Sequence, residues 1–179
     1  MDDLLEVLAA MAGTRARTEN PRELFLDMAE RVVKHVAAVF GARSDEVAIL
    51  FLTTDAKHLR FVAPGKFADL GTIPITKRDS IAVNIFARKS GEALNNVPMV
   101  KHVAFFESVK LRDRALPIQK MITVPILHEG EAMGVAQVSR KGETVAEAGP
   151  DFTPADVRRA EQIFEVVAPY LVSARPDRF

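Results

Sequence analysis

The sequence predicts an α+β domain in which an antiparallel sheet is covered by helices from both ends of the chain. Two well-delimited helical patterns, over residues 21–40 and 154–171, enclose the middle of the chain. Between them lie short apolar segments and one clear strand hairpin. With few strands and with helices at both ends, an antiparallel sheet with helices packed on it is the economical architecture.

The first long helix has a defined start and end. Asn20 can cap it, Pro21 suits its first position and Glu23 completes a pattern like a capping box, while Gly41 ends it. Apolar residues recur between these ends at helical spacing, namely Phe25, Ala29, Val32, Val36 and Val39. A shorter helix is predicted over residues 3–12.

Five segments rich in β-branched or aromatic residues predict strands. They are residues 47–52, 59–63, 72–75, 121–127 and 132–140, of which the last two form a hairpin around residues 128–131. The nearly continuous apolar run of the first segment predicts a strand covered on both faces. Pro74 confines its segment to an edge or a strand end, and Gly134 inside a strand predicts a bulge or a close backbone approach.

The connecting segments are less uniform. Asp79 or Ser80 caps a helix that Gly91 stops, and residues 92–95 resume extended chain. Residues 97–112 fit either a helix or an ordered loop. Residues 142–152, rich in Gly, Ala and Glu, predict a mobile loop.

The last helix again begins with clear signals. Thr153 caps it, Pro154 takes the first position and Asp156 gives a second pattern like a capping box. Its apolar face is Val157, Ala160, Ile163, Phe164, Val167 and Leu171. Pro169 predicts a disturbed final turn, because proline has no amide hydrogen and clashes with the preceding turn.

The composition is that of one globular domain, since the chain has 179 residues, of which 48% are hydrophobic and 27% charged. No apolar run approaches the roughly 18–20 residues that span a bilayer. The acidic start, Met1-Asp2-Asp3, is unlike a basic secretory signal, so we expect a cytoplasmic protein without a membrane segment. The absence of cysteine excludes disulfides, thiolate nucleophiles and Cys-ligated zinc or iron–sulfur clusters.

Charge is distributed unevenly along the chain, although the formal net charge is zero. Residues 57–141 contain 14 Lys and Arg against 7 Asp and Glu, a net charge of +7. This segment either favours an anionic ligand or forms an ordinary solvated surface. The zero net charge, and the lack of aromatic residues among the basic ones, predict that the chain does not bind nucleic acid.

Four stretches of the sequence are similar to the GAF domain family. Residues 80–94 resemble its first core helix and the following strand, and residues 122–126 resemble a strand with a Val-Pro step. Residues 130–138 resemble the return strand, and residues 151–157 resemble the entry to the final helix. The related PAS fold is the alternative, but it fits the terminal helices and the Val-Pro hairpin less well.

The resemblance covers residues 21–172, which leaves a helical extension over residues 1–20 and a tail over residues 173–179. It implies a GAF-like sheet with the N- and C-terminal helices on one face and a variable segment, over residues 97–120, above the other. Members of the family generally bind a small molecule between the sheet and that segment in signal transduction. By resemblance and strand position, eight residues are candidates for lining the pocket: Phe51, Phe61, Ser80, Asn84, His102, Phe105, Thr123 and Gln137.

Five of these candidates have an ordinary alternative. Thr123 and Gln137 are polar residues within apolar strands, and they either face the pocket or face solvent. The alternative for Phe51, Phe61 and Phe105 is the hydrophobic core.

Specialised members of the family depend on residues that can be sought in this sequence. Bilin attachment and free methionine sulfoxide reduction require cysteine, which the chain lacks, and the cyclic-nucleotide signature is not found near Asn95-Asn96. Haem-binding members use an axial histidine, for which His102 is the candidate, against an ordinary hydrogen-bonding role. No nucleophile–base pair or metal-binding motif is evident. We therefore predict a sensory domain that is not an enzyme and has no cofactor.

The alternative to a small-molecule sensor is a ligand-free dimerisation or interaction module. Leu4, Leu8 and Met11 form an apolar face that either packs against a partner's helices or folds back onto the same domain. Many GAF domains dimerise through their terminal helices, so the resemblance implies a homodimer under either hypothesis. No output domain is visible in the sequence, so either the protein acts on a signalling protein as partner or the chain is one piece of a longer polypeptide.

Overall fold

The computed structural model describes residues 1–100 and 116–179. Six strands form one antiparallel sheet in the order β3-β2-β1-β6-β5-β4. The strands are β1 (Val47–Leu52), β2 (His58–Ala63), β3 (Thr72–Pro74), β4 (Glu92–Leu94), β5 (Ile118–His128) and β6 (Glu131–Lys141). The predicted α+β architecture is therefore confirmed, although β5 starts earlier than the sequence predicts.

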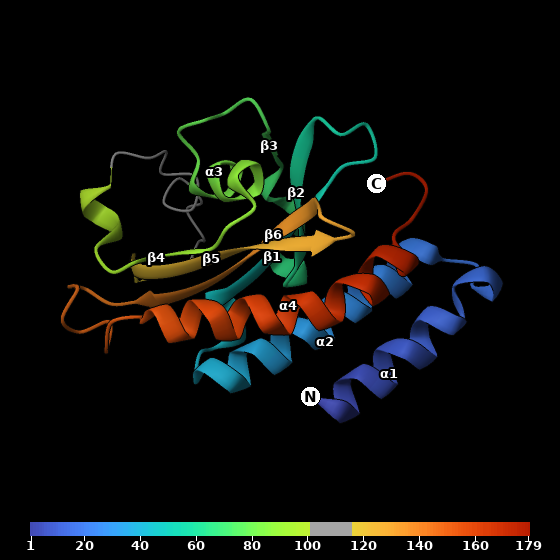
Figure 1. Ribbon diagram of the computed structural model, residues 1–179, viewed down its shortest axis with the longest axis horizontal. Coiled ribbons are helices and arrows are strands. Elements are labelled where there is room, and N and C mark those ends of the chain that lie inside the picture. The colour runs from blue at the N-terminus through green and yellow to red at the C-terminus, as the bar shows by residue number, and fades with distance from the viewer. Residues whose placement is uncertain (101–115) are drawn as a thin grey trace.

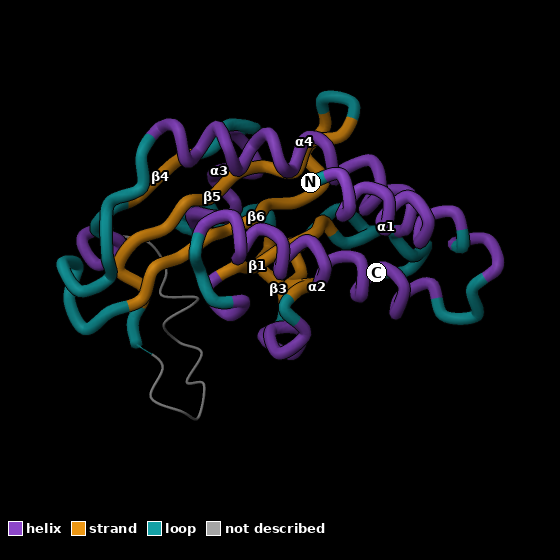
Figure 2. The backbone as a smooth tube through the Cα atoms, turned by 90° about the horizontal axis from the view of Figure 1, so that it is seen from below, coloured by secondary structure: helices purple, strands orange, loops and turns teal. Residues whose placement is uncertain are grey.

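Helices cover both faces of the sheet, as Figures 1 and 2 show. They are α1 (Asp2–Gly13), α2 (Pro21–Phe40), α3 (Ile81–Arg88) and α4 (Pro154–Ala174). The three terminal helices share one core with one face of the sheet, and α3 packs on the other face. None of the helices in the described part of the chain is long and apolar enough to span a membrane. Residues 101–115, which make up most of the segment predicted to lie over the α3 face, are outside the described residues.

The helix ends follow the local signals in the sequence. The side chain of Asn20 accepts a hydrogen bond from the Glu23 amide at 3.2 Å. Thr153 and Asp156 form a reciprocal capping box, in which the Asp156 carboxylate accepts from the Thr153 amide at 2.7 Å. The apolar face of α1 folds back onto the domain, because Leu8 is fully buried in the core that α2 and α4 share.

The sequence predicts that Pro169 disturbs the final turn of the last helix. This prediction is wrong, because α4 continues unbroken to Ala174. Residues on both sides of the proline, including Phe164 and Leu171, are fully buried, so tertiary packing keeps the helix intact. Proline has no amide hydrogen, however, so the carbonyl of Glu165 loses its helical donor.

The segment 142–152 is also better fixed than the mobile loop that the sequence predicts. Lys120 is buried and donates to the carbonyl of Gly149 at 2.6 Å and to the carboxylate of Asp151 at 2.7 Å. Asn95 and Phe152 exchange two hydrogen bonds of 2.9 and 2.8 Å. The contacts that hold this segment come from residues far away in the sequence. The composition of the segment alone therefore could not predict these contacts.

Gly134 lets two central strands approach closely, as the sequence predicts. It lies opposite Phe51 in the ladder between β6 and β1. A Cβ atom at this position would lie 2.2 Å from the carbonyl oxygen of Leu50. That oxygen belongs to the backbone of a buried strand, so it cannot move aside without breaking the ladder.

We therefore expect Gly134→Ala to lower the free energy of unfolding by about 2–3 kcal/mol or more, because overpacking a core forces the backbone to shift. Urea denaturation followed by circular dichroism measures the change. Gly13→Ala is the matched control, because no atom lies within 4 Å of a Cβ at Gly13, and its stability should stay within about 0.5 kcal/mol. Equal stabilities for the two variants would contradict the close approach.

Candidate functional site

A polar pair lies on the α3 face in the middle of the sheet. Thr123 on β5 is directly opposite Gln137 on β6. Their neighbours in sequence, such as Val124 and Ala136, belong to the core beneath the terminal helices. Because successive side chains of a strand point to opposite faces, Thr123 and Gln137 point toward the α3 side. Both are buried, with 1% and 3% of their surface exposed, so the solvent-facing alternative is wrong.

The amide of Gln137 has partners at only one end within the described residues. Its Nε2 donates to the hydroxyl of Thr123 and to the thioether of Met121, each at 3.2 Å. Its Oε1 is buried and has no hydrogen-bond partner among these residues. Leaving a buried acceptor unpaired costs about 1–3 kcal/mol. Rotating the amide by 180° would exchange the two atoms and leave an unpaired donor instead.

The start of α3 lies close to this pair. Ser80, which is 5% exposed, caps the helix by accepting a hydrogen bond from the Val83 amide at 3.5 Å. The next residue, Ile81, packs against a small cluster that contains Met121, whose sulfur contacts the Gln137 amide. The positive end of the helix dipole therefore lies on the same side of the sheet as the unpaired acceptor and near it.

The other candidates divide between the two faces. Phe61 is buried on the α3 face and packs edge-to-face on Phe67. Phe51 lies on the opposite face, in the core beneath the helices, where its ring packs edge-to-face on Phe25. The sheet thus separates Phe51 from Thr123 and Gln137. Asn84 is exposed on α3.

His102 and Phe105 lie outside the described residues. Ser80, Thr123, Gln137 and Phe61 are therefore the candidates that the structure brings to one face. Met121, which contacts the Gln137 amide, was not among the predicted site residues. It could have been predicted, because it lies two residues before Thr123 and therefore on the same face of the strand.

Comparison with known proteins identifies the fold. Residues 25–171 match the GAF domain family. The chain belongs to the GAF domain family. No curated protein sequence matches this GAF domain.

Solved structures with the same fold are distant in sequence. The GAF domain of an Acinetobacter phosphoenolpyruvate-protein phosphotransferase superposes with a TM-score of 0.63 at 13% identity, over 96% of this chain and 94% of that chain. Residues 122 to 287 of a methyl-accepting chemotaxis protein give 0.60 at 19% identity, over 92% and 96%. The free methionine-R-sulfoxide reductase of Neisseria meningitidis, solved with its substrate, gives 0.58 at 16% identity, over 96% and 90%. At these identities the likeness concerns the fold alone.

The half-satisfied amide of Gln137, whose Oε1 lacks a partner among the described residues, predicts an unusual pattern of stabilities. Thr123→Val removes a partner of Nε2 and should lower the free energy of unfolding by about 1 kcal/mol. The double variant Thr123→Val, Gln137→Met replaces both polar groups by apolar ones of similar size. Its free energy of unfolding should lie between that of the wild type and about 1 kcal/mol above it. Urea denaturation of the set measures this. A double variant less stable by more than about 2 kcal/mol would show that the pair is fully satisfied and structural.

Proposed function

We propose that this GAF domain is a cytoplasmic, non-catalytic sensor that binds a small molecule on the α3 face, in contact with Gln137. The single observation that carries the proposal is the buried Oε1 of Gln137, which has no hydrogen-bond partner within residues 1–100 and 116–179. Buried polar groups in proteins nearly always have a partner, and an acceptor without one is suited to receive a ligand. A hydrogen-bond donor on a small molecule would supply the missing partner.

The family supports a role in signalling. GAF domains are sensory and regulatory modules, and one chain of this fold belongs to a methyl-accepting chemotaxis protein. Another, the Neisseria reductase, was solved with its substrate, so the fold can hold a small molecule. The present chain has no cysteine, which leaves thiol-based reduction without a nucleophile. In the described residues, His, Asp and Glu do not gather into a group of three that would hold a metal.

An anionic ligand is the first class to examine. The segment over residues 57–141 carries a net charge of +7. The N-terminus of α3, which favours negative charge, lies near the unpaired acceptor. The ligand we propose therefore combines an anionic group with a hydrogen-bond donor for Gln137.

We also propose that the domain forms a homodimer through its terminal helices. A signalling protein would then respond to ligand binding. Leu4, Leu8 and Met11 contribute to the domain's own core and are not free to bind a partner. Val7 on α1 and Val166 on α4 are exposed to 38% and 41%, and these are the apolar side chains that a second copy would cover. This apolar surface is small, so it is weak support for a function limited to protein interaction. The Oε1 of Gln137, without a partner in the described residues, is stronger support for a bound ligand.

A thermal-shift screen with anionic metabolites and nucleotides tests the ligand. A compound at 100 times its Kd should stabilise the wild type by about 2.7 kcal/mol through binding linkage. The double variant Thr123→Val, Gln137→Met is the matched control, because it should stay folded and lose most of the shift. Equal shifts in both proteins would place the ligand elsewhere. No shift with any compound, together with a dimer in light scattering, would favour the ligand-free module.

A further inference from the structure

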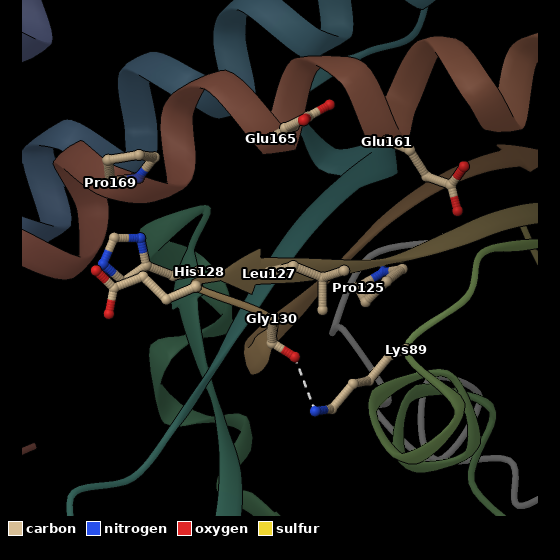
Figure 3. Close-up of a pocket in the computed structure, with 9 residues that line it drawn as sticks. Lys89, Pro125, Leu127, His128, Gly130, Glu161, Glu165 and Pro169 are labelled. Atoms are coloured by element: carbon tan, nitrogen blue, oxygen red, sulfur yellow. Dashed lines mark hydrogen bonds between the residues drawn. The ribbon is translucent and has the colours of Figure 1, made fainter.

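A groove follows one edge of the sheet, on the side away from β3. β4 pairs with β5 only from Met121 to Thr123. Beyond that point β5 pairs with β6 alone, so the remainder of its outer edge has no strand beside it within the described residues. Figure 3 shows the cavity at this open edge, with α4 above it and Lys89, at the end of α3, below it. Its volume is about 560 Å³, within the range of ligand-binding pockets.

The groove carries more negative charge than its own cations balance. The ammonium of Lys89 is already occupied, because it donates to the carbonyl of Gly130 at 2.8 Å and to Glu131 at 2.9 Å. Glu129, Glu161 and Glu165 also line the cavity. Across residues 1–100 and 116–179, none of these three carboxylates forms an ion pair with a lysine or arginine.

Two of the acceptors in the groove belong to α4. Glu161 is held in place because its Oε1 accepts the amide of Gly91 at 2.8 Å, which leaves its other oxygen for a donor from outside. Pro169 lines the groove and deprives the carbonyl of Glu165 of its helical donor. The floor beside them is apolar and includes Pro125 and Leu127. The groove thus combines an apolar floor with carboxylate acceptors, which suits the stem and the head of a lysine or arginine side chain.

The groove extends further than one small molecule requires. A second cavity of about 470 Å³ lies between α4 and the edge of β4, and Glu161 lines both cavities. Together they follow α4 from Pro154 to Pro169. That stretch of helix is about 22 Å long, which equals about seven residues of extended chain.

We propose that this groove binds an extended, basic peptide segment of a partner protein, with its lysine or arginine side chains in the wider cavity beside Glu129 and Glu165. The length of the groove and the open strand edge fit an extended chain, and its unbalanced carboxylates select a basic one. This interaction surface is separate from the small-molecule site on the α3 face, and it does not depend on that site.

Fluorescence anisotropy with a labelled seven-residue peptide of alternating lysine and threonine tests the proposal on the full chain. We expect binding at about 50 mM salt that weakens at about 0.5 M salt, because exposed charges are screened. Replacing lysine by glutamate in the peptide should abolish binding. The variant Glu129→Lys, Glu165→Lys should weaken it about tenfold or more, since two ion pairs become repulsive contacts.

Glu147→Lys is the matched control, because Glu147 is exposed on the segment 142–152 and does not line the groove. Its affinity for the lysine peptide should equal that of the wild type. The proposal is overturned if the lysine peptide does not bind at millimolar concentration, or if both charge variants weaken it equally. It is also overturned if sedimentation shows a homodimer that only the groove variant disrupts, because the occupant would then be a second copy of the chain.

Discussion

The register between β5 and β6 is the constraint on which the α3 face depends. It places Thr123 opposite Gln137, and it continues into β1, where Gly134 lies opposite Phe51. A slip of one residue would turn the polar pair toward the terminal helices, into a fully apolar core. Gly134 opposes such a slip, because a Cβ atom at its place in the ladder would lie 2.2 Å from the carbonyl oxygen of Leu50. This close approach and the apolar core beneath the terminal helices together favour the observed register.

The elements that were predictable from the sequence are those defined by residues close together in the chain. Asn20 and Thr153 each accept a hydrogen bond from the backbone amide three residues later, so a short stretch of sequence predicts where α2 and α4 begin. Gly134 was predictable for a similar reason, since a glycine within a β-branched run usually marks a bulge or a close backbone approach.

Properties set by distant contacts were not predictable. The run over residues 47–52 is apolar on both sides, so nothing in it shows that Phe51 faces α2 instead of α3. Thr123 and Gln137 alternate correctly with their neighbours, but alternation leaves open whether the polar face is solvated or covered. Their burial is a tertiary property, and α3, which is distant from both residues in sequence, packs on the same face of β5 and β6. The groove beside α4 was missed because it joins residues from α3, β5 and α4.

Two local irregularities among the described residues, at Gln137 and Pro169, lie at the two sites proposed for this chain. Caps, turns and core packing agree with one another over most of the described residues, as expected of a sequence that specifies one structure. Arg15 and Arg175 each leave a buried Nε unpaired, but each donates through Nη2 to a carbonyl. A guanidinium has five donors and loses little when one is unused.

Gln137 differs from these arginines because its amide has a single acceptor atom, and that atom has no partner in the part of the chain that the structure describes. Pro169 likewise removes the one donor that the Glu165 carbonyl would have in a regular helix. The unpaired acceptor of Gln137 lowers stability, and a donor from outside can satisfy it. Pro169 removes one hydrogen bond from the helix beside the groove. Residues that function requires are expected to break the rules of stability in this way, so the acceptor on the α3 face is the place where ligand binding would restore stability.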